Sequence, residues 1–425
     1  MPDMNFSEDY EYAKLLDADD EMGIFRGQYV IADSQELYMD GNSLGRMPRR
    51  SLECLQRIVE KEWGHQLIRS WGQGWYDAPQ RVGEKIAGLI GAAPGQVIVC
   101  DSTSVNLYKL VMAALALRPD RMKIVSDTMN FPSDLYILQG CITSAGACHK
   151  LHLVPSLDGV TLDLAELFGA IDEDTALVTL SHVAYKSGFL YDAASITSWA
   201  EEKGALVLWD LSHSVGAVPI ELDRWGAHMA VGCTYKYLNG GPGAPAFLYV
   251  NKGLQTKTLS PVWGWFGERA PFYFEPIYQP AEGVQRFMSG TPPILSLLVM
   301  EQGVDLALEA GIERVRKKSL GLTNYFISLF DIRLHPLGFT LGTPRDPAIR
   351  GSHVSLRHPS GYQVTRALIE EMRVIPDFRE PDNIRFGLSA MYTTYSEVWD
   401  TVERIYQVIN EERFLNYPAT RLSIT

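Results

Sequence analysis

The chain has 425 residues, of which 46% are hydrophobic and 21% are charged. These proportions are typical of a soluble globular protein and exclude a disordered tail, a fibrous protein and a coiled coil. Acidic residues outnumber basic ones by 51 to 38, and the net charge of −13 argues against nucleic acid as a partner.

The five cysteines are scattered along the chain without metal-binding or redox spacing. We therefore expect free thiols in a reducing cytoplasm and no bound metal. No apolar run approaches the roughly 20 residues that a helix needs to cross a bilayer, so we expect no membrane association.

The first 48 residues are loop-rich, and an alternating series of strands and helices follows. The strand candidates are short apolar runs, at 97–100, 122–126, 151–154, 176–181, 205–210, 229–233 and 246–250. Helical patterns lie between several of them, at 105–117 and 193–203. This alternation predicts an α/β domain whose mainly parallel, seven-stranded sheet lies between helices. The last strand follows a glycine-rich loop and is expected to run antiparallel.

The pattern changes near residue 294, where two long helical patterns begin, at 295–308 and 312–329. Shorter strand and helix patterns follow them. We predict a large domain at 49–293 and a smaller C-terminal α/β domain at 294–425. The N-terminal segment, 1–48, is expected to pack on the smaller domain.

Ligands of open parallel sheets bind beyond the carboxyl ends of the strands, so the residues that follow each strand are the candidate site residues. Hydroxyl residues at 102–104 stand at the start of a predicted helix, where they serve either as helix caps or in an anion site. This motif alone favours the capping interpretation. Phe131 follows the next strand, on a loop, where it either stacks on a flat ligand or anchors the loop in the core.

Two strand ends carry the residues with the clearest chemistry. Asp210 ends a strongly apolar run and suits either the partner of a protonated pyridine nitrogen or a helix cap. Lys236 follows the next strand, between two tyrosines, and a desolvated lysine amine is what Schiff-base chemistry requires. One strand–helix–strand step separates the two residues, which makes the pair a stronger signal than either alone.

The motifs around these residues resemble the kynureninase family of fold-type I pyridoxal-phosphate enzymes, which are related to class-V aminotransferases. The resemblance covers most of the chain. It rests on YMDGNSLG at 38–45, LIRSW at 67–71, NFPSDLY at 130–136, WDLSHS at 209–214, TYKYLNGGPG at 234–243, GWFG at 264–267 and DFREP at 377–381.

The resemblance implies a role for each matching residue toward pyridoxal 5'-phosphate. Lys236 forms the Schiff base, Asp210 pairs with the pyridinium nitrogen beside His213, and Phe131 stacks on the ring. The phosphate is bound by Thr103, Ser104 and Tyr235, together with Trp265 and Thr291 from the second subunit of a homodimer. Asp134 and Ser181 contact ring substituents.

The implied reaction is hydrolysis of L-kynurenine, and possibly of its 3-hydroxy derivative, to the corresponding anthranilate and L-alanine, in tryptophan catabolism or NAD biosynthesis. It proceeds through a substrate–cofactor Schiff base and cleavage of the Cβ–Cγ bond. Lys236 removes the Cα proton, and either Tyr235 or Lys236 donates the last one. Arg385 binds the α-carboxylate, while Ser43, His65 and Trp71 line the aryl end of the pocket.

Two departures from the family pattern point in opposite directions. Thr291 stands where animal relatives have asparagine and favours kynurenine, whereas His65 follows the animal pattern. The alternatives are another class-V enzyme, such as a cysteine desulfurase, a related enzyme of secondary metabolism, or a non-catalytic protein. A desulfurase requires a cysteine on a mobile loop, but Cys233 lies in a predicted strand and no cysteine follows it.

Overall fold

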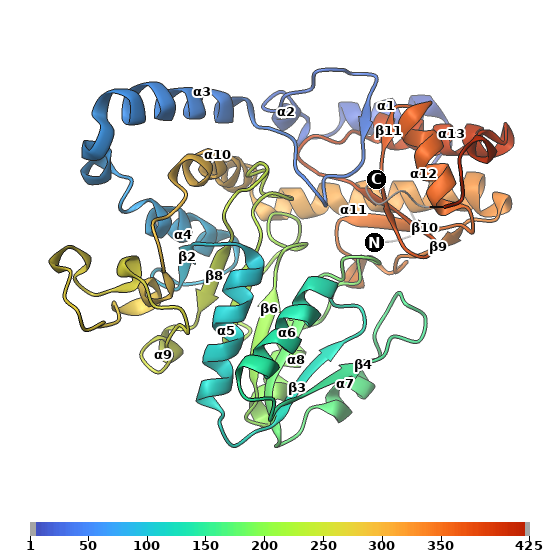
Figure 1. Cartoon of the computed structure of the whole chain (residues 1–425). Coiled ribbons are helices and arrows are strands. Elements are labelled where there is room, and N and C mark those ends of the chain that lie inside the picture. The colour runs from blue at the N-terminus through green and yellow to red at the C-terminus, as the bar shows by residue number, and fades with distance from the viewer. Residues whose placement is uncertain (1–5, 421–425) are drawn as a thin grey trace.

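The computed structural model describes residues 6–420, which form a large α/β part and a smaller one side by side (Figure 1). The large part is built on one sheet of seven strands. These are β2 (Val97–Val99), β3 (Lys123–Asp127), β4 (Lys150–Val154), β5 (Thr175–Ser181), β6 (Leu206–Asp210), β7 (Met229–Gly232) and β8 (Phe247–Val250). The predicted strands agree with these bounds to within one residue.

The strand order is β2-β8-β7-β6-β5-β3-β4. The β8 strand runs antiparallel to both neighbours, and all other adjacent strands are parallel. The mainly parallel sheet and its antiparallel last strand are therefore confirmed. Carboxyl ends of the parallel strands meet at one edge, where Ser181 and Asp210 are register partners at the ends of β5 and β6.

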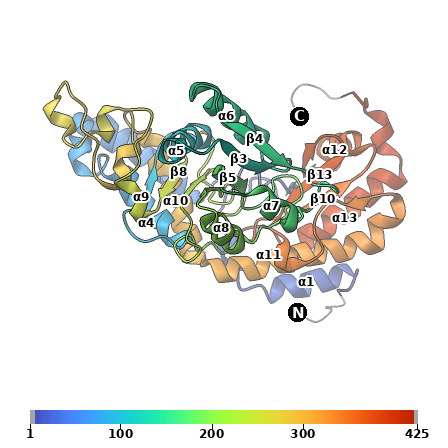
Figure 2. The same cartoon turned by 90° about the horizontal axis from the view of Figure 1, so that it is seen from below.

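Helices cover both faces of this sheet because side chains of successive strand residues point to opposite faces. Ile124 and Leu177 pack with α5 (Thr103–Leu117) and α6 (Pro132–Ser144). Val125 and Val178 pack in the core on the other face, whose helices are α4 (Ala78–Leu89), α7 (Leu164–Ala170), α8 (Ala193–Glu202) and α10 (Ile294–Ala310). Figure 2 shows the sheet between these two layers.

The smaller part has its own core around a four-stranded antiparallel sheet of order β12-β13-β10-β9. The strands are β9 (Thr340–Leu341), β10 (His353–Arg357), β12 (Asp377–Arg379) and β13 (Asn383–Gly387). Its helices are α11 (Ile312–Leu329), α12 (Gly361–Glu370) and α13 (Tyr395–Asn410). A two-stranded parallel sheet joins β1 (Leu37–Tyr38) to β11 (Val374–Ile375).

The N-terminal segment is more helical than its loop-rich sequence indicates. It contains α1 (Tyr10–Ala18) and the single turn α2 (Gly23–Arg26). The α1 helix contacts α13 and buries one residue, Ala13, in the smaller core. Tyr12 and Leu16 are partly buried against the same core, so the helix has one apolar face, but its nine residues are a run short enough for the sequence pattern to have missed.

The domain boundaries at residues 48 and 293 stay predictions. The α10 helix lies beyond the second boundary, yet most of its buried apolar side chains belong to the core of the large sheet, while Leu306 and Ala310 pack in a separate cluster with Phe25 and Tyr29. Within residues 6–420, no helix is both long and apolar enough to cross a membrane.

Candidate active site

The Lys236 amine is the centre of the candidate site. It lies in the loop between β7 and β8, with Nζ 3.2 Å from His213 Nε2 and 3.5 Å from Nδ1. The ring centres of Phe131 and Tyr235 are each 5.8 Å from the same nitrogen. His213 is buried, and burial followed by the Lys236 charge lowers its pKa well below the usual range. The amine therefore faces a neutral imidazole.

Two buried carboxyl groups, Asp210 and Asp134, lie against each other close to this amine. Asp210 ends β6, where its Oδ1 accepts hydrogen bonds from Ser212 N at 2.9 Å and Ser212 Oγ at 2.6 Å. Burial raises the pKa of Asp210, while the Ser212 bonds and the Lys236 charge oppose this rise. Burial and the Asp210 charge raise the pKa of Asp134 well above its usual range.

The chemistry of the Asp210–Asp134 pair suits the pyridine nitrogen of pyridoxal phosphate. Within residues 6–420, the buried Oδ2 atom of Asp134 has no hydrogen-bond partner. Two adjacent carboxyl groups with raised pKa values favour a cationic N–H group between or beside them. A protonated pyridine nitrogen is such a group, so these residues suit pyridoxal phosphate.

Phe131 and Ser181 lie at the same sheet edge. Phe131 directly precedes α6, and its ring meets the Tyr185 ring edge to face with centres 5.1 Å apart. Ser181 Oγ donates to Asn130 Oδ1 at 2.8 Å, and Asn130 Nδ2 donates to Ser126 Oγ at 3.0 Å. Asn130 begins the NFPSDLY motif, which assigns it no role, but its buried amide holds Ser181 in place.

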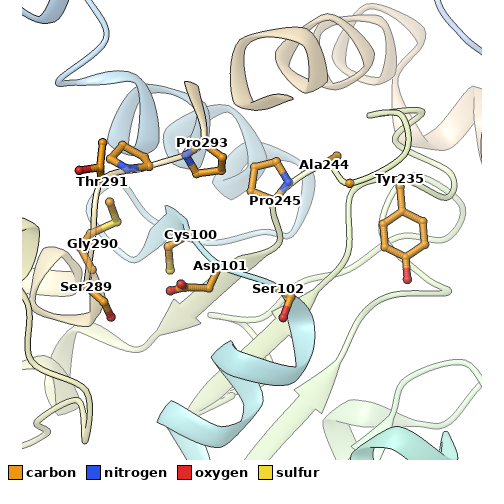
Figure 3. A pocket seen from close by; sticks show the side chains of 13 residues that line it. Cys100, Asp101, Ser102, Tyr235, Ala244, Pro245, Ser289, Gly290, Thr291 and Pro293 are labelled. Atoms are coloured by element: carbon orange, nitrogen blue, oxygen red, sulfur yellow. The ribbon is translucent and has the colours of Figure 1, made fainter. Parts of the chain in front are cut away.

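Asp101 and Ser102, directly before α5, line a pocket of about 440 Å³ together with Tyr235 and Thr291 (Figure 3). The helix starts at Thr103. The preceding residue, Ser102, accepts a hydrogen bond from Val105 N through its side chain at 3.4 Å. Ser102 is thus the cap. Thr103 lies in the free first turn, where backbone N–H groups and the helix dipole favour an anion.

Two further observations bear on this anion site. Ser104 Oγ lies 3.2 Å from Ser133 Oγ at the start of α6. The Asp101 carboxylate is paired with the fully buried Lys109 amine at 2.5 Å, which offsets its negative charge beside the helix start. Sequence reasoning missed Lys109 because an amine on an apolar helix carries no pattern of its own.

Arg385 lies on β13 and is only 1% exposed. Its Nη1 donates to the Tyr185 carbonyl at 2.5 Å, and its Nη2 donates to Ser43 Oγ at 3.1 Å and to the Asp377 carboxylate. The Arg385 Nε atom is buried without a partner in the part of the chain that the structure describes. Both Nη atoms already contact protein groups, so a two-point contact to the α-carboxylate of the substrate stays a prediction that requires Ser43 or Asp377 to give up its bond.

Asp377 is a site residue whose role sequence reasoning missed. The register of the small sheet places it directly opposite Arg385, and Arg379 Nη2 lies 2.9 Å from its carboxylate. Nothing in the local sequence indicates that β12 and β13 pair in this register.

Four predicted site residues lie apart from Lys236 within one chain. His65 and Trp71 belong to η1 (Ile58–Gln66) and η2 (Leu67–Gln73), which follow α3 (Arg49–Arg57), and α3 lies at the opposite end of the molecule from α12 in Figure 1. Trp265, in η3 (Trp265–Gly267), is 37% exposed and packs on Phe266. Thr291 lies across the pocket from Tyr235 (Figure 3).

Comparisons with known proteins show the family to which the chain belongs. The sequence matches the family model "Aminotransferase class-V" over residues 37–349 and the model "Kynureninase C-terminal domain" over residues 315–405. It is 45% identical to the kynureninase of Pseudomonas fluorescens over 402 residues, which are 93% of this chain and 94% of that protein. It is 43% identical to the kynureninase of Burkholderia pseudomallei (strain 1106a) over 421 residues, 98% and 99% of the two chains.

Solved structures show the same fold in more distant proteins. An apo cysteine desulfurase from Thermococcus onnurineus NA1 has a TM-score of 0.80 at 18% identity and covers 92% of this chain and 98% of its own. The cystine C-S lyase C-DES has a TM-score of 0.77 at 17% identity and covers 88% and 98%. At such identities the likeness shows the fold alone. Cys233 here is buried directly after β7, which does not suit a desulfurase's mobile cysteine.

Proposed function

The chain belongs to the kynureninase family of class-V aminotransferase-like enzymes, and we propose that it hydrolyses L-kynurenine to anthranilate and L-alanine with pyridoxal 5'-phosphate as its cofactor. The observation that carries this proposal is the Lys236 amine, which contacts His213 and lies near two buried carboxyl groups, Asp210 and Asp134. This placement supports the proposal, because pyridoxal phosphate needs an amine for its aldehyde and a carboxyl partner for its pyridine nitrogen.

The proposed cofactor contacts follow from this placement. Lys236 would hold the cofactor through its aldehyde, Phe131 would contact the ring, and Asp210 would pair with the ring nitrogen. Thr103 and Tyr235 bind the phosphate at the start of α5. When bound, the cofactor supplies an electron sink for the negative charge that develops at the substrate Cα.

The chain's own groups then bind the substrate and move its protons. Arg385 binds the α-carboxylate and so fixes the Cα–H bond relative to the Lys236 amine, which takes the proton. Water attacks the γ-carbonyl carbon, and the Cβ–Cγ bond breaks to release anthranilate. The Lys236 amine returns its proton to Cα, and Cβ receives a second proton. Of the two protons lost by the water, one replaces that second proton and the other leaves as H+. The neighbouring Cys233 and burial raise the pKa of Tyr235 well above its usual range. Tyr235 therefore stays protonated at neutral pH, and we assign it the final donation to Cβ.

The proposal is tested with purified, cofactor-saturated protein and L-kynurenine. The expected result is stoichiometric release of fluorescent anthranilate and of L-alanine, measured by emission and by amino-acid analysis. Absence of anthranilate from protein that carries the cofactor would contradict the proposed function. The same assay with 3-hydroxy-L-kynurenine decides between the opposing indications of Thr291 and His65.

We also propose that the active unit is a homodimer in which each subunit completes the other's site. Exposed apolar side chains support it, since contiguous patches of this kind mark interfaces. One group lines a pocket of about 480 Å³ beside the loop after Lys236: Leu44, Met47, Leu52, Leu55 and Leu295. A second group lies on an aromatic segment: Trp263, Trp265, Phe272, Tyr273 and Phe274. His65, Trp71, Trp265 and Thr291 then serve the neighbouring subunit.

Mixing two inactive variants is expected to restore activity if the sites are shared. One variant carries Lys236→Ala, and the other carries Trp265→Ala with Thr291→Ala. Random reassociation makes half of the dimers hybrid with one intact site each, so the mixture recovers about a quarter of wild-type activity. Light scattering on each variant is the control for dimer formation. Failure to recover activity from demonstrably mixed dimers would contradict shared sites.

A cytoplasmic location is the remaining proposal. The five free thiols support it, since Cys54, Cys100, Cys141 and Cys233 are buried and Cys148 is exposed, a pattern stable in a reducing compartment.

A further inference from the structure

Two histidine side chains from different parts of the fold lie side by side behind Lys236. His213 follows β6 in the large part, and His353 begins β10 in the smaller part. Their ring centres are 6.0 Å apart at an interplanar angle of 57°. His353 is fully buried, and His213 is nearly so. The sequence motifs assign no role to His353.

The environment of His353 is unusual for a structural histidine. Both ring nitrogens are buried and neither makes a well-aligned hydrogen bond within residues 6–420, although the Lys186 backbone lies within reach of the ring. An unsatisfied buried polar group is destabilising, so its retention calls for an explanation. Gly188, at φ +75°, leaves room for this ring, since a Cβ atom there would lie 3.3 Å from His353 Nε2 and 3.0 Å from its carbonyl oxygen.

Both imidazoles are neutral at physiological pH. Burial and then the charges of Arg385 and Lys236 lower the pKa of His353 to about 3, while the nearby Lys186 backbone opposes this slightly. The pKa of His213 is lowered first by burial, then by the charges of Lys236 and Arg385, and more weakly by His353 and Arg379. These are the charged and titratable groups that face the pair.

A neutral imidazole carries one donor nitrogen and one acceptor nitrogen. His213 accepts from the Lys236 ammonium through the nearer nitrogen, Nε2, at 3.2 Å. Its Nδ1 then bears the proton and requires an acceptor. A bare nitrogen of His353 is a buried acceptor beside it. The 6.0 Å between ring centres is too long for a direct hydrogen bond and suits one bridging water.

We infer that His353 is a positioning residue that accepts a hydrogen bond from His213 through one buried water, and so keeps the His213 lone pair directed at Lys236 Nζ. The inference rests on the proposed function for the role of Lys236. It adds that a residue of the smaller part of the fold sets how strongly the protonated Lys236 nitrogen is stabilised.

The test is a pair of substitutions at His353 with a spectroscopic readout. His353→Leu removes the acceptor, whereas the amide oxygen of His353→Gln supplies one without titrating. The visible absorption band of cofactor-loaded protein is titrated with pH, because that band reports the protonation of the Lys236 nitrogen. His353→Leu is expected to lower the band's apparent pKa by about one unit and kcat by about tenfold, with KM nearly unchanged. His353→Gln is expected to restore most of both.

His182 provides a matched control. It is also buried, its Nδ1 also lacks a partner in the described chain, and its ring packs on Trp209 and Trp225, with centres 5.9 and 5.1 Å away. His182→Leu is expected to lower the unfolding temperature as His353→Leu does, but to leave the band's pKa in place.

Three outcomes would overturn the inference. They are an unshifted band in folded His353→Leu, no recovery in His353→Gln, and an equal shift in His182→Leu. The band is measured without kynurenine, so it remains readable if the wild-type protein forms no anthranilate, which is the separate failure of the proposed function.

Discussion

Replacing Lys236 with alanine is expected to reduce anthranilate formation by at least about 1,000-fold, because one side chain supplies both the covalent anchor and the general base. The structure places this amine 3.2 Å from His213 Nε2 and 5.8 Å from the centre of the Phe131 ring. Borohydride treatment of wild-type protein is expected to fix a pyridoxyl group on the peptide that contains Lys236. The measurement is mass spectrometry of the digested protein.

Lys203 is the control for this substitution. Its amine pairs with Glu173 at 3.0 Å on an exposed surface, and such pairs contribute little to stability. Lys203→Ala is expected to keep full activity and the pyridoxyl label. The assignment of Lys236 would fail if the Lys236→Ala protein retained a tenth of the wild-type rate, or if borohydride still attached the group elsewhere on the chain.

The parts of the fold that could be predicted are those whose burial is periodic along the chain. Buried parallel strands read as continuous apolar runs, so all seven strands of the large sheet were located. Their order then places the residues after each strand at one sheet edge, which brings Asp210 and Lys236 together. Local sequence is sufficient to predict these site residues, because parallel strands place their carboxyl ends at the same edge of the sheet.

The missed residues are those whose role depends on a partner that the fold, and not a local sequence pattern, brings into contact. Asp377 meets Arg385 only through the register of β12 and β13, and Lys109 meets Asp101 only because α5 packs below the pocket. His353 reaches His213 from the other part of the fold. Trp265 and Thr291 differ again, since their predicted role requires a second copy of the chain. Patterns within one segment contain no information on such contacts.

Replacing Asp210 with asparagine is expected to lower turnover by about 100- to 1,000-fold while weakening cofactor binding much less. Asparagine keeps the acceptor oxygen for Ser212 N and Oγ, so the side chain stays in place and only the charge is lost. That charge is needed most after the Cα proton has left, because it holds the ring nitrogen protonated while negative charge develops. A group that acts mainly in the transition state affects rate more than binding.

Asp127 provides the matched control for the loss of a buried charge. It also ends a strand of the large sheet and is buried, but its carboxylate accepts hydrogen bonds from Tyr191 Oη at 2.7 Å and Met129 N at 2.6 Å. Asp127→Asn is expected to change the unfolding temperature and leave kcat near the wild-type value. Cofactor affinity is measured by fluorescence titration and turnover by anthranilate emission. Equal losses of affinity and turnover in Asp210→Asn would contradict a role mainly in the transition state, and an unchanged turnover would remove Asp210 from the site.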